Sequence, residues 1–468
     1  MNHLLKSPLM AAVSALLLTA PLLTSAVQAT EEVEQPNPLR FYQGDNDSFL
    51  QASVGLDLAY FSMDNAWYGN DRAVIGSDID HWWESLVRLG LEGSYTLPNS
   101  QTFYAKVDAV QANTFGGIDV GGTNDVYGDV SSLRFDKAYA GWRSGQLFSS
   151  LGEDFLDISL GRQLYTVGNG FLFASQGQGG GKRAAWYLGG RRSADFSTII
   201  RMHSGPWSGD LFYFEEDRMN DFEKGYFCDQ NTKAGGATME YAFSESAHLG
   251  GSLFALDSDD LNRDGMQVYD LRGDIKPFAR LGGAEIMQPL QFEGEYAHED
   301  KDNDQDNGNG WYAAVSYRFA EVPWQPELTY RYASFDQHYD PLFYGGTDWG
   351  TWYQGEIVGE YDDLANSNID THMIRLKIHP LESLTIHLFY FNFTVHKPEA
   401  LLQFGSATES VTSDDYADEW DLIFDWAATD HLTLSLVGAY AKPDDAAAQH
   451  YGGNDDWTAM MLYGCLKF

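Results

Sequence analysis

The sequence contains little cysteine and little positive charge. Two cysteines in 468 residues, Cys228 and Cys465, cannot form a disulfide framework for a chain of this length, and the sequence leaves open whether they pair. The 29 lysines and arginines face 68 aspartates and glutamates, which gives a formal net charge of −39. Because nucleic-acid binding needs a basic surface, this balance excludes a nucleic-acid partner.

Long apolar runs are absent after the N-terminus. Residues 1–29 contain Lys6, an apolar stretch from Leu9 to Leu23 and small residues before Ala29, which predicts a secretory signal peptide cut after Ala29. No later segment approaches the roughly 20 apolar residues of a membrane-spanning helix. Since no Pro- or Gly-rich linker divides the rest, residues 30–468 are predicted to form one domain.

Catalytic motifs are also missing. The sequence contains neither H-E-x-x-H nor G-x-S-x-G, and its histidines and aspartates form only scattered pairs. We therefore expect a protein that is not an enzyme and that needs no cofactor.

Alternation of apolar and polar residues runs through the remaining chain, and a period of two predicts strands. In residues 418–440, tryptophans and leucines alternate with carboxylates, threonine and serine. The same alternation occurs at 50–60, 87–95, 103–109, 290–296, 311–319, 328–332 and 372–378.

Strands with one apolar face suit two surroundings. The apolar face can pack in the core of a soluble sandwich or propeller, or it can face membrane lipid around a barrel. Aromatic residues end many of the apolar rows, short turns alternate with long acidic loops, and the chain ends in a strand that closes on Phe468. These features favour an all-β transmembrane antiparallel barrel in the bacterial outer membrane, and no repeat of 40–50 residues supports a propeller. Counting apolar rows and requiring an even number predicts about 18 strands.

Charged side chains on the polar faces are then expected to line a water-filled lumen. Parity assigns to it the basic residues Arg88, Lys106, Arg134, Arg318, Arg331, Arg375, Lys377 and Lys467. It also assigns the acidic residues Asp57, Glu92, Asp108, Asp136, Asp157, Glu293, Glu295, Glu327, Glu356, Glu360, Glu419, Asp421 and Asp425. The acids outnumber the bases, so the lumen could favour cations, bind carboxylates at local basic clusters, or carry opposed rows of both signs.

Two loops hold further candidate residues. Lys182, Arg183, Arg191 and Arg192 follow the glycine-rich stretch QGQGGG, which does not match a phosphate-binding loop. These bases could contact lipopolysaccharide phosphates or a solute in the lumen. Asp260, Asn262 and Asp264 match the start of a calcium loop, but Leu271 stands where the bidentate glutamate belongs, so Ca²⁺ binding is a weaker alternative to a solvated loop.

Four sequence blocks resemble the alginate export family of outer-membrane proteins. They are Leu160–Gln163, Trp349–Glu356, Glu419–Leu422 and Lys442–Ala446. The resemblance implies a monomeric 18-stranded barrel whose lumen arginines pass an anionic uronate polymer. It assigns pore roles to Arg88 and Arg162, although strand parity turns Arg162 toward lipid unless Gly161 hosts a bulge or the residue lies at the rim.

The expected function is thus a passive outer-membrane channel for a uronate polysaccharide or a related solute. A porin that takes up small solutes or cations is the first alternative, and an outer-membrane hydrolase or an adhesion barrel is the second. For either kind of channel, the expected partners are membrane lipid, lipopolysaccharide and a polysaccharide or small solute. The sequence does not distinguish export from import.

Overall fold

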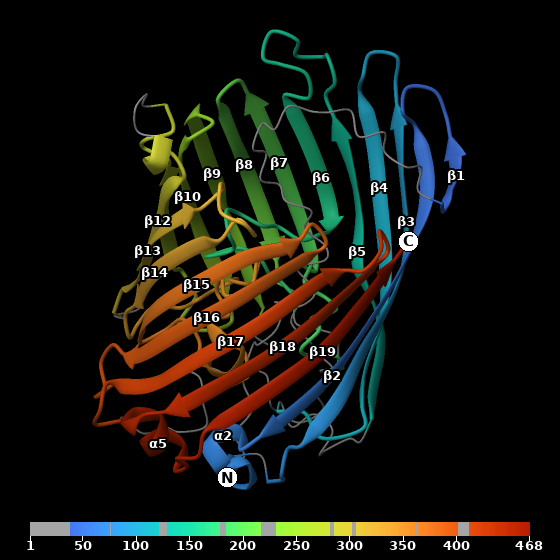
Figure 1. Ribbon diagram of the computed structural model, residues 1–468. Helices are drawn as coiled ribbons and strands as arrows, with labels where there is room; N and C mark the ends of the chain where they lie inside the picture. Colours follow the sequence, from blue (N-terminus) through green and yellow to red (C-terminus); the bar gives the residue numbers. More distant parts are fainter. Residues whose placement is uncertain are drawn as a thin grey trace.

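The computed structural model describes residues 38–74, 76–120, 129–177, 184–216, 231–280, 285–301, 306–361, 364–400 and 411–468. The signal peptide predicted for residues 1–29, the two bases Lys182 and Arg183, and Cys228 lie outside these ranges. The described chain forms one closed antiparallel barrel (Figure 1).

The barrel wall consists of 18 strands, β2 to β19, each paired with its sequence neighbours. Their bounds are β2 Phe49–Asp64, β3 His81–Thr96, β4 Thr102–Phe115, β5 Val130–Arg143, β6 Leu156–Arg162, β7 Phe196–Ser204, β8 Trp207–Glu215, β9 Thr232–Ser244, β10 Ala247–Ser258, β11 Gln267–Ile275, β12 Leu290–Asp300, β13 Gly308–Arg318, β14 Glu327–Phe335, β15 Ile369–Leu381, β16 Leu384–Val395, β17 Asp415–Ala427, β18 Leu432–Pro443 and β19 Trp457–Lys467. Short helical segments are α2 Ala66–Gly69, α3 Asp71–Val74, η1 Glu285–Met287, η2 Gly355–Gly359 and α5 Asp445–Tyr451. The predicted fold class and the number of wall strands are confirmed.

Pairing of β19 with β2 closes the barrel. Thr458 to Lys467 pair with Asp64 to Gly55, and Phe468 exchanges backbone hydrogen bonds with Val54. The chain ends there, but β2 continues, and the short strand β1 (Arg40–Gln43) pairs with its remaining edge. Because unpaired backbone groups are costly in lipid, β1 covers part of the edge of β2 that β19 does not pair with.

The outer face carries the apolar rows that the sequence predicted. Trp420, Leu422 and Trp426 of β17 are exposed on it, and so are Leu434 and Leu436 of the neighbouring β18. Exposed aromatic and aliphatic side chains of this kind occur around the wall, as lipid requires. Among the described residues, no helix has both the length and the apolar composition needed to cross a membrane.

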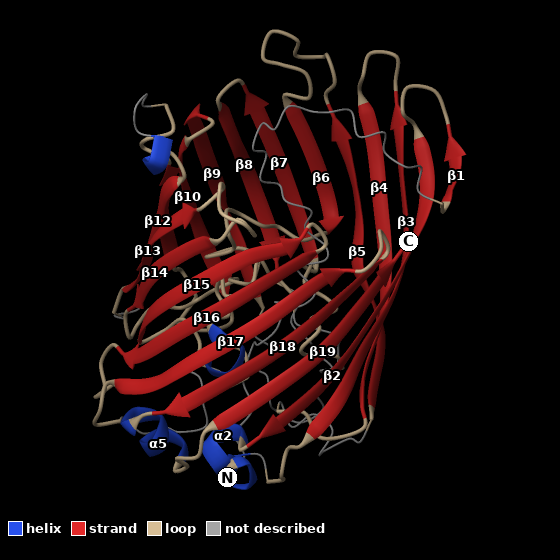
Figure 2. Ribbon diagram, in the orientation of Figure 1, coloured by secondary structure: helices blue, strands red, loops and turns tan. Residues whose placement is uncertain are grey.

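The two ends of the barrel differ. At the turn end, connections are as short as 205–206, 245–246 and 382–383. At the loop end they are longer, and the longest are 163–195, between β6 and β7, and 336–368, between β14 and β15. Figure 2 shows η2, which belongs to the second of these, as a short helix beside β17, while α2 and α5 lie at the loop end.

The assignment of one strand face to lipid and the other to the lumen predicts how a charged substitution on each face changes stability. Arginine in place of Leu422, at the centre of β17 on the outer face, should lower the free energy of unfolding in lipid vesicles by about 2–4 kcal/mol. Gln291→Arg on β12 is the matched control, because the register pairs Gln291 with Ser316 on the inner face. Urea titration measures both, and an equal loss in the control would contradict the assignment of faces.

Candidate functional site

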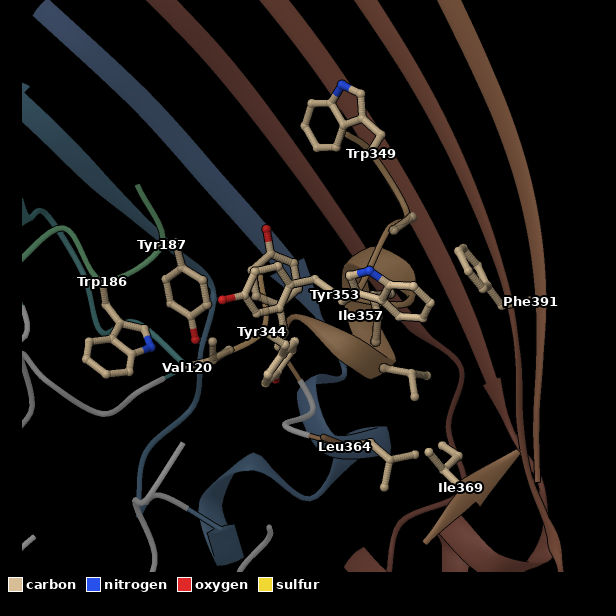
Figure 3. Close-up of a cluster of buried hydrophobic side chains, with 14 of the residues drawn as sticks. Val120, Trp186, Tyr187, Tyr344, Trp349, Tyr353, Ile357, Leu364, Ile369 and Phe391 are labelled. Atoms are coloured by element: carbon tan, nitrogen blue, oxygen red, sulfur yellow. The ribbon is translucent and has the colours of Figure 1, made fainter. Parts of the chain in front are cut away.

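Two long loops fold into the barrel and meet inside it. Phe173 of the β6–β7 loop forms a parallel bridge with Phe343 of the β14–β15 loop, and Tyr187 lies 5.1 Å from Tyr361 between ring centroids. These side chains are almost fully buried. Figure 3 shows aromatic residues of both loops gathered inside the wall, so the lumen is narrowed by packed loops and is not an open tube.

Buried glutamates on the wall hold both loops by their backbone. Glu84 of β3 accepts hydrogen bonds from the N–H groups of Tyr187 and Leu188, at 3.2 and 2.8 Å. Glu419 of β17 accepts bonds from Ile357 and Val358 in the same way, at 2.6 and 2.8 Å. A loop inside a barrel has buried N–H groups to satisfy, and a carboxylate with two oxygens satisfies two neighbouring ones.

Asp136 of β5 is a second anchor on the β6–β7 loop. It accepts hydrogen bonds from the backbone N–H groups of Arg192 and Ser193, and Arg88 of β3 donates to its other oxygen at 3.1 Å. Arg88 also reaches the carbonyl of Gly190 at 3.5 Å. The predicted pore arginine is therefore at the inner face and is engaged by the loop.

Arg331 of β14 anchors the other loop. Its guanidinium donates to the carbonyl of Gly350 at 2.7 Å and to the Gln354 side chain at 3.1 Å, and it lies 4.6 Å from the centre of the Trp352 ring. It is buried, so it binds the loop and does not face water.

Many of the acids counted in the sequence are buried, and four of them, Glu84, Asp136, Glu419 and Asp421, anchor the loops. The buried acidic side chains among the described residues are Asp57, Glu84, Asp108, Asp119, Asp136, Asp270, Glu295, Glu299, Glu356, Glu360, Glu419 and Asp421. Because these groups are covered, the charge that a solute meets must be counted from the partly exposed residues.

On the wall formed by β3 to β6, the exposed charge is mainly positive. Lys137 and Asp108 lie 4.0 Å apart, and the lysine side chain is 21% exposed while the aspartate is 3% exposed. Arg143 and Asp157 lie 3.2 Å apart, with 47% and 19% exposure. Lys106 contacts Glu92 at 2.7 Å, with similar exposure of the two. We call these three ion pairs the basic wall.

On two other parts of the wall the order is reversed. Arg272 of β11 is 9% exposed, whereas its partner Glu240 at 2.8 Å is 47% exposed. Arg375 of β15 is 15% exposed and bonds Glu327 and Asp348, both at 3.1 Å, which are 29% and 37% exposed. We call the second group, Arg375 with Glu327 and Asp348, the acidic wall.

The two walls oppose each other. In an 18-stranded barrel, strands nine positions apart lie across the lumen, and β14 and β15 are nine positions from β5 and β6. A water path between the walls therefore passes partly exposed bases on one side and the partly exposed carboxylates of Glu327 and Asp348 on the other, where Arg318 and Lys377 are the cross-strand neighbours of Glu327.

Several predicted lumen residues lie on the inner face as parity required. In the strand register, Arg134 is opposite the buried Val110. Arg318 and Lys377 are opposite Glu327, one on each neighbouring strand, at the turn end. Lys467 lies near the turn end, opposite Gly55. Asp421 is on the inner face of β17 and accepts the N–H of Glu356 at 3.3 Å, so it too is an anchor.

Two assignments need correction. Arg162 is the last residue of β6, its register through Gly161 is regular, and it forms an ion pair with Asp195, so of the two positions that parity left open it occupies the loop-end rim and does not line the lumen between the walls. Glu356 and Glu360 are buried inside the barrel, but they belong to η2 and its end, not to a strand. Strand parity was thus the wrong reason for placing them there.

Lys137 was missed. The register shifts between Asp108 and Ala109, so that Asp136 is an extra residue on β5 and both Asp136 and Lys137 point inward. The signal was two adjacent charged residues between the outward-facing Phe135 and Ala138. Arg201 and Arg272 were also missed, although both continue the alternation of their strands, β7 and β11.

The basic stretch after QGQGGG is described only in part. Arg191 and Arg192 are buried in the β6–β7 loop inside the barrel, and Arg192 donates to the carbonyl of Ala174. They therefore do not face lipopolysaccharide.

The three candidate calcium ligands make local turn contacts. Asp260 accepts the N–H of Asn262 at 3.0 Å, and Asp264 accepts the N–H of Ser258 at 3.4 Å. Arg263, between them in sequence, is buried and donates to Asp340 through two nitrogens at 2.7 Å. In the described part of the chain, no three side chains are grouped to hold a metal ion.

Comparison with protein families identifies the barrel. The family model "Alginate export" matches residues 117–456, which is well over half of the chain. The chain belongs to the alginate export family. The family match and the fold place it in the bacterial outer membrane as a porin-type channel, a class of barrels that are not enzymes. No curated protein matches the sequence.

Solved structures from Pseudomonas aeruginosa share the fold. OprD is 13% identical, covers 90% of this chain and 95% of its own, and has a TM-score of 0.55. OccK8 (OprE) is 11% identical, with 90% and 98% covered and a TM-score of 0.56. OpdK is 11% identical, with the same coverage and a TM-score of 0.54. Identity this low shows the fold alone.

Anchoring by Asp136 makes a prediction about the loop. Asp136→Ala should leave the N–H groups of Arg192 and Ser193 and the Arg88 guanidinium without their acceptor, at a cost of about 1–3 kcal/mol for each buried group. Hydrogen exchange at the Arg192 and Ser193 amides should accelerate at least tenfold. Asp157→Ala, which touches neither amide, should leave both rates unchanged, and equal rates in the two variants would contradict the anchor.

Proposed function

We propose that the protein is a passive channel for small solutes that carry carboxylates and hydroxyl groups, with uronate oligosaccharides as the leading candidates. The observation that carries this proposal is the separation of water-exposed charge between the basic wall and the acidic wall.

A uronate suits such a passage chemically. Its carboxylate forms charge-assisted hydrogen bonds with lysine and arginine, and its hydroxyl groups donate to carboxylates on the other side. Water-filled charged walls bind weakly enough for the solute to leave again, as conduction requires. Passive passage follows the concentration gradient and needs no cofactor.

Packing of the two lumen loops favours oligomers over a bulky polymer. The loops contact each other as well as the wall, through Tyr187 with Tyr361 and Phe173 with Phe343. The family name supports a uronate, and OpdK, which shares the fold, was solved with vanillate, another carboxylate.

The proposal includes the orientation and surroundings of the barrel. Outer-membrane barrels have short periplasmic turns and longer extracellular loops, so the loop end faces outward and meets lipopolysaccharide. A closed wall has no free strand edge to pair with a second copy, which favours a monomer.

Single-channel recording with uronate trimers tests the function. Trimers should block the current in a concentration-dependent way, and Lys106→Gln combined with Lys137→Gln should weaken the block about tenfold or more, since each removes a charge-assisted contact. Glu327→Gln combined with Asp348→Asn is the matched control on the acidic wall and should not weaken it by this amount.

Cation selectivity without block would overturn the uronate proposal and leave a porin for small cations. Block that is equal in wild type and the lysine variant would overturn the role of the basic wall. Comparing trimers with long polymer, applied from either side, tests the preference for short chains.

A further inference from the structure

A group of buried carboxyl side chains lies where the β14–β15 loop docks on the wall. Glu356 and Glu360 come from the loop, Glu419 and Asp421 from β17, and Glu84 from β3; we call these five the carboxyl cluster. All five are at most 5% exposed.

Docking in this region depends on the acids themselves. Glu419 and Asp421 accept three consecutive backbone N–H groups of η2, those of Glu356, Ile357 and Val358. The carboxyl of Glu360 is 2% exposed, and neither of its oxygens has a hydrogen-bond partner among the described residues. It is thus a buried polar group that the docked loop leaves unsatisfied.

The elements packed around η2 contribute further acids and apolar groups. β17 adds Asp425, the segment before residue 121 adds Asp119, and the loops add Tyr187 and Tyr361. The buried inward residues of β18 and β19 include Val437, Ala439, Ala459, Met461 and Tyr463. Arg375 and Lys377 of β15 act on Asp348, and Arg88 of β3 pairs with Asp136, so these bases are engaged with other acids.

Ionisation in such surroundings is unfavourable. Burial raises the pKa of Glu360 well above its ordinary value, and the neighbouring Glu84 raises it further. Burial likewise raises the pKa of Glu356, with added repulsion from Glu360, Glu419 and Asp425. A carboxyl whose pKa is raised in the docked state favours docking below its ordinary pKa, and this contribution is lost as the pH rises through the raised pKa.

We propose that Glu356 and Glu360 act as a proton-controlled latch within the carboxyl cluster. When both are protonated, the β14–β15 loop stays on β17, where Glu419 and Asp421 accept its N–H groups; when they are ionised, repulsion from the other carboxylates of the cluster releases the loop. Release widens the lumen, so that protonation regulates the channel. This inference rests on the proposed function only in requiring that the barrel conducts ions.

The contact between the β14–β15 loop and the wall is formed partly by glycine backbone, without interlocking side chains, so the loop can separate from the wall and bind again. At Gly350 an added Cβ would lie 2.5 Å from the Phe389 ring, and at Gly355 it would lie 2.6 Å from Glu419. The loop therefore sits on the wall through bare backbone at two points. Beneath it, the rings of Phe389, Phe391 and Phe393 stack along β16 at 5.6 Å spacing, and release would uncover them to the lumen.

Single-channel conductance of the full chain in potassium chloride tests the latch without any solute. Between about pH 5 and pH 9, a range that covers raised carboxyl pKa values, wild-type conductance should rise at least twofold. Glu356→Gln combined with Glu360→Gln should keep the low conductance throughout, because neutral amides do not repel. Glu382→Gln, in the exposed β15–β16 turn, should keep the wild-type transition.

Gly355→Ala is the opposite variant and should give the high conductance already at low pH, since its methyl group collides with Glu419. Conductance that does not depend on pH, or a transition that persists in the double glutamine variant, would overturn the latch while leaving the channel intact. Absence of any conductance would instead overturn the proposed function.

Hydrogen exchange tests release of the loop in the wild-type protein, so its result does not depend on whether the variants fold. After correction for the intrinsic pH dependence of exchange, the Ile357 and Val358 amides should lose protection across the same pH range as the conductance rises, and the amides of β16 and β17 should not. Retained protection of Ile357 and Val358 at high pH would contradict release.

Discussion

The bond between a buried wall carboxylate and two neighbouring N–H groups of a loop is the interaction on which the lumen depends. Glu84 and Glu419 form it with different loops, on β3 and β17, strands that lie on either side of the β19–β2 closure. A loop threaded into a barrel loses water from its backbone, and each N–H group needs an acceptor there. Buried carboxylates supply these acceptors. This gives a physical reason why the protein is acidic although few acids are exposed on its basic wall.

This use of acids explains how a chain of net charge −39 presents a basic wall. Asp108 and Asp136 are covered by the sheet and the β6–β7 loop, while Lys137 beside them remains partly exposed. On β15, Arg375 is the covered group, and its acidic partners Glu327 and Asp348 are more exposed. The charge that faces the lumen therefore depends on which member of each ion pair is buried, and net charge does not reveal it.

Much of the wall was predictable, because lipid on one face and water on the other impose a period of two on every strand. Trp420, Leu422 and Leu436 followed that rule. It failed for Lys137, where a bulge breaks the alternation, and for Glu356 and Glu360, because a loop folded into the lumen has no period. The partners of the loops lie about 60 to 100 residues away, as with Glu419 and Ile357 or Glu84 and Leu188, and no local pattern encodes such contacts. The two sequence blocks that resemble the family, 349–356 and 419–422, did contain both partners of one anchor, Glu356 and Asp421.

The central claim, that opposed charged walls orient a uronate, is tested most directly by a crystal structure of the protein with a uronate trimer. The account predicts that the trimer lies between the two walls, with carboxylates within hydrogen-bond distance of Lys106, Lys137 or Arg143 and hydroxyl groups toward Glu327 and Asp348. A trimer bound in the reverse orientation, or bound only outside the lumen, would contradict it.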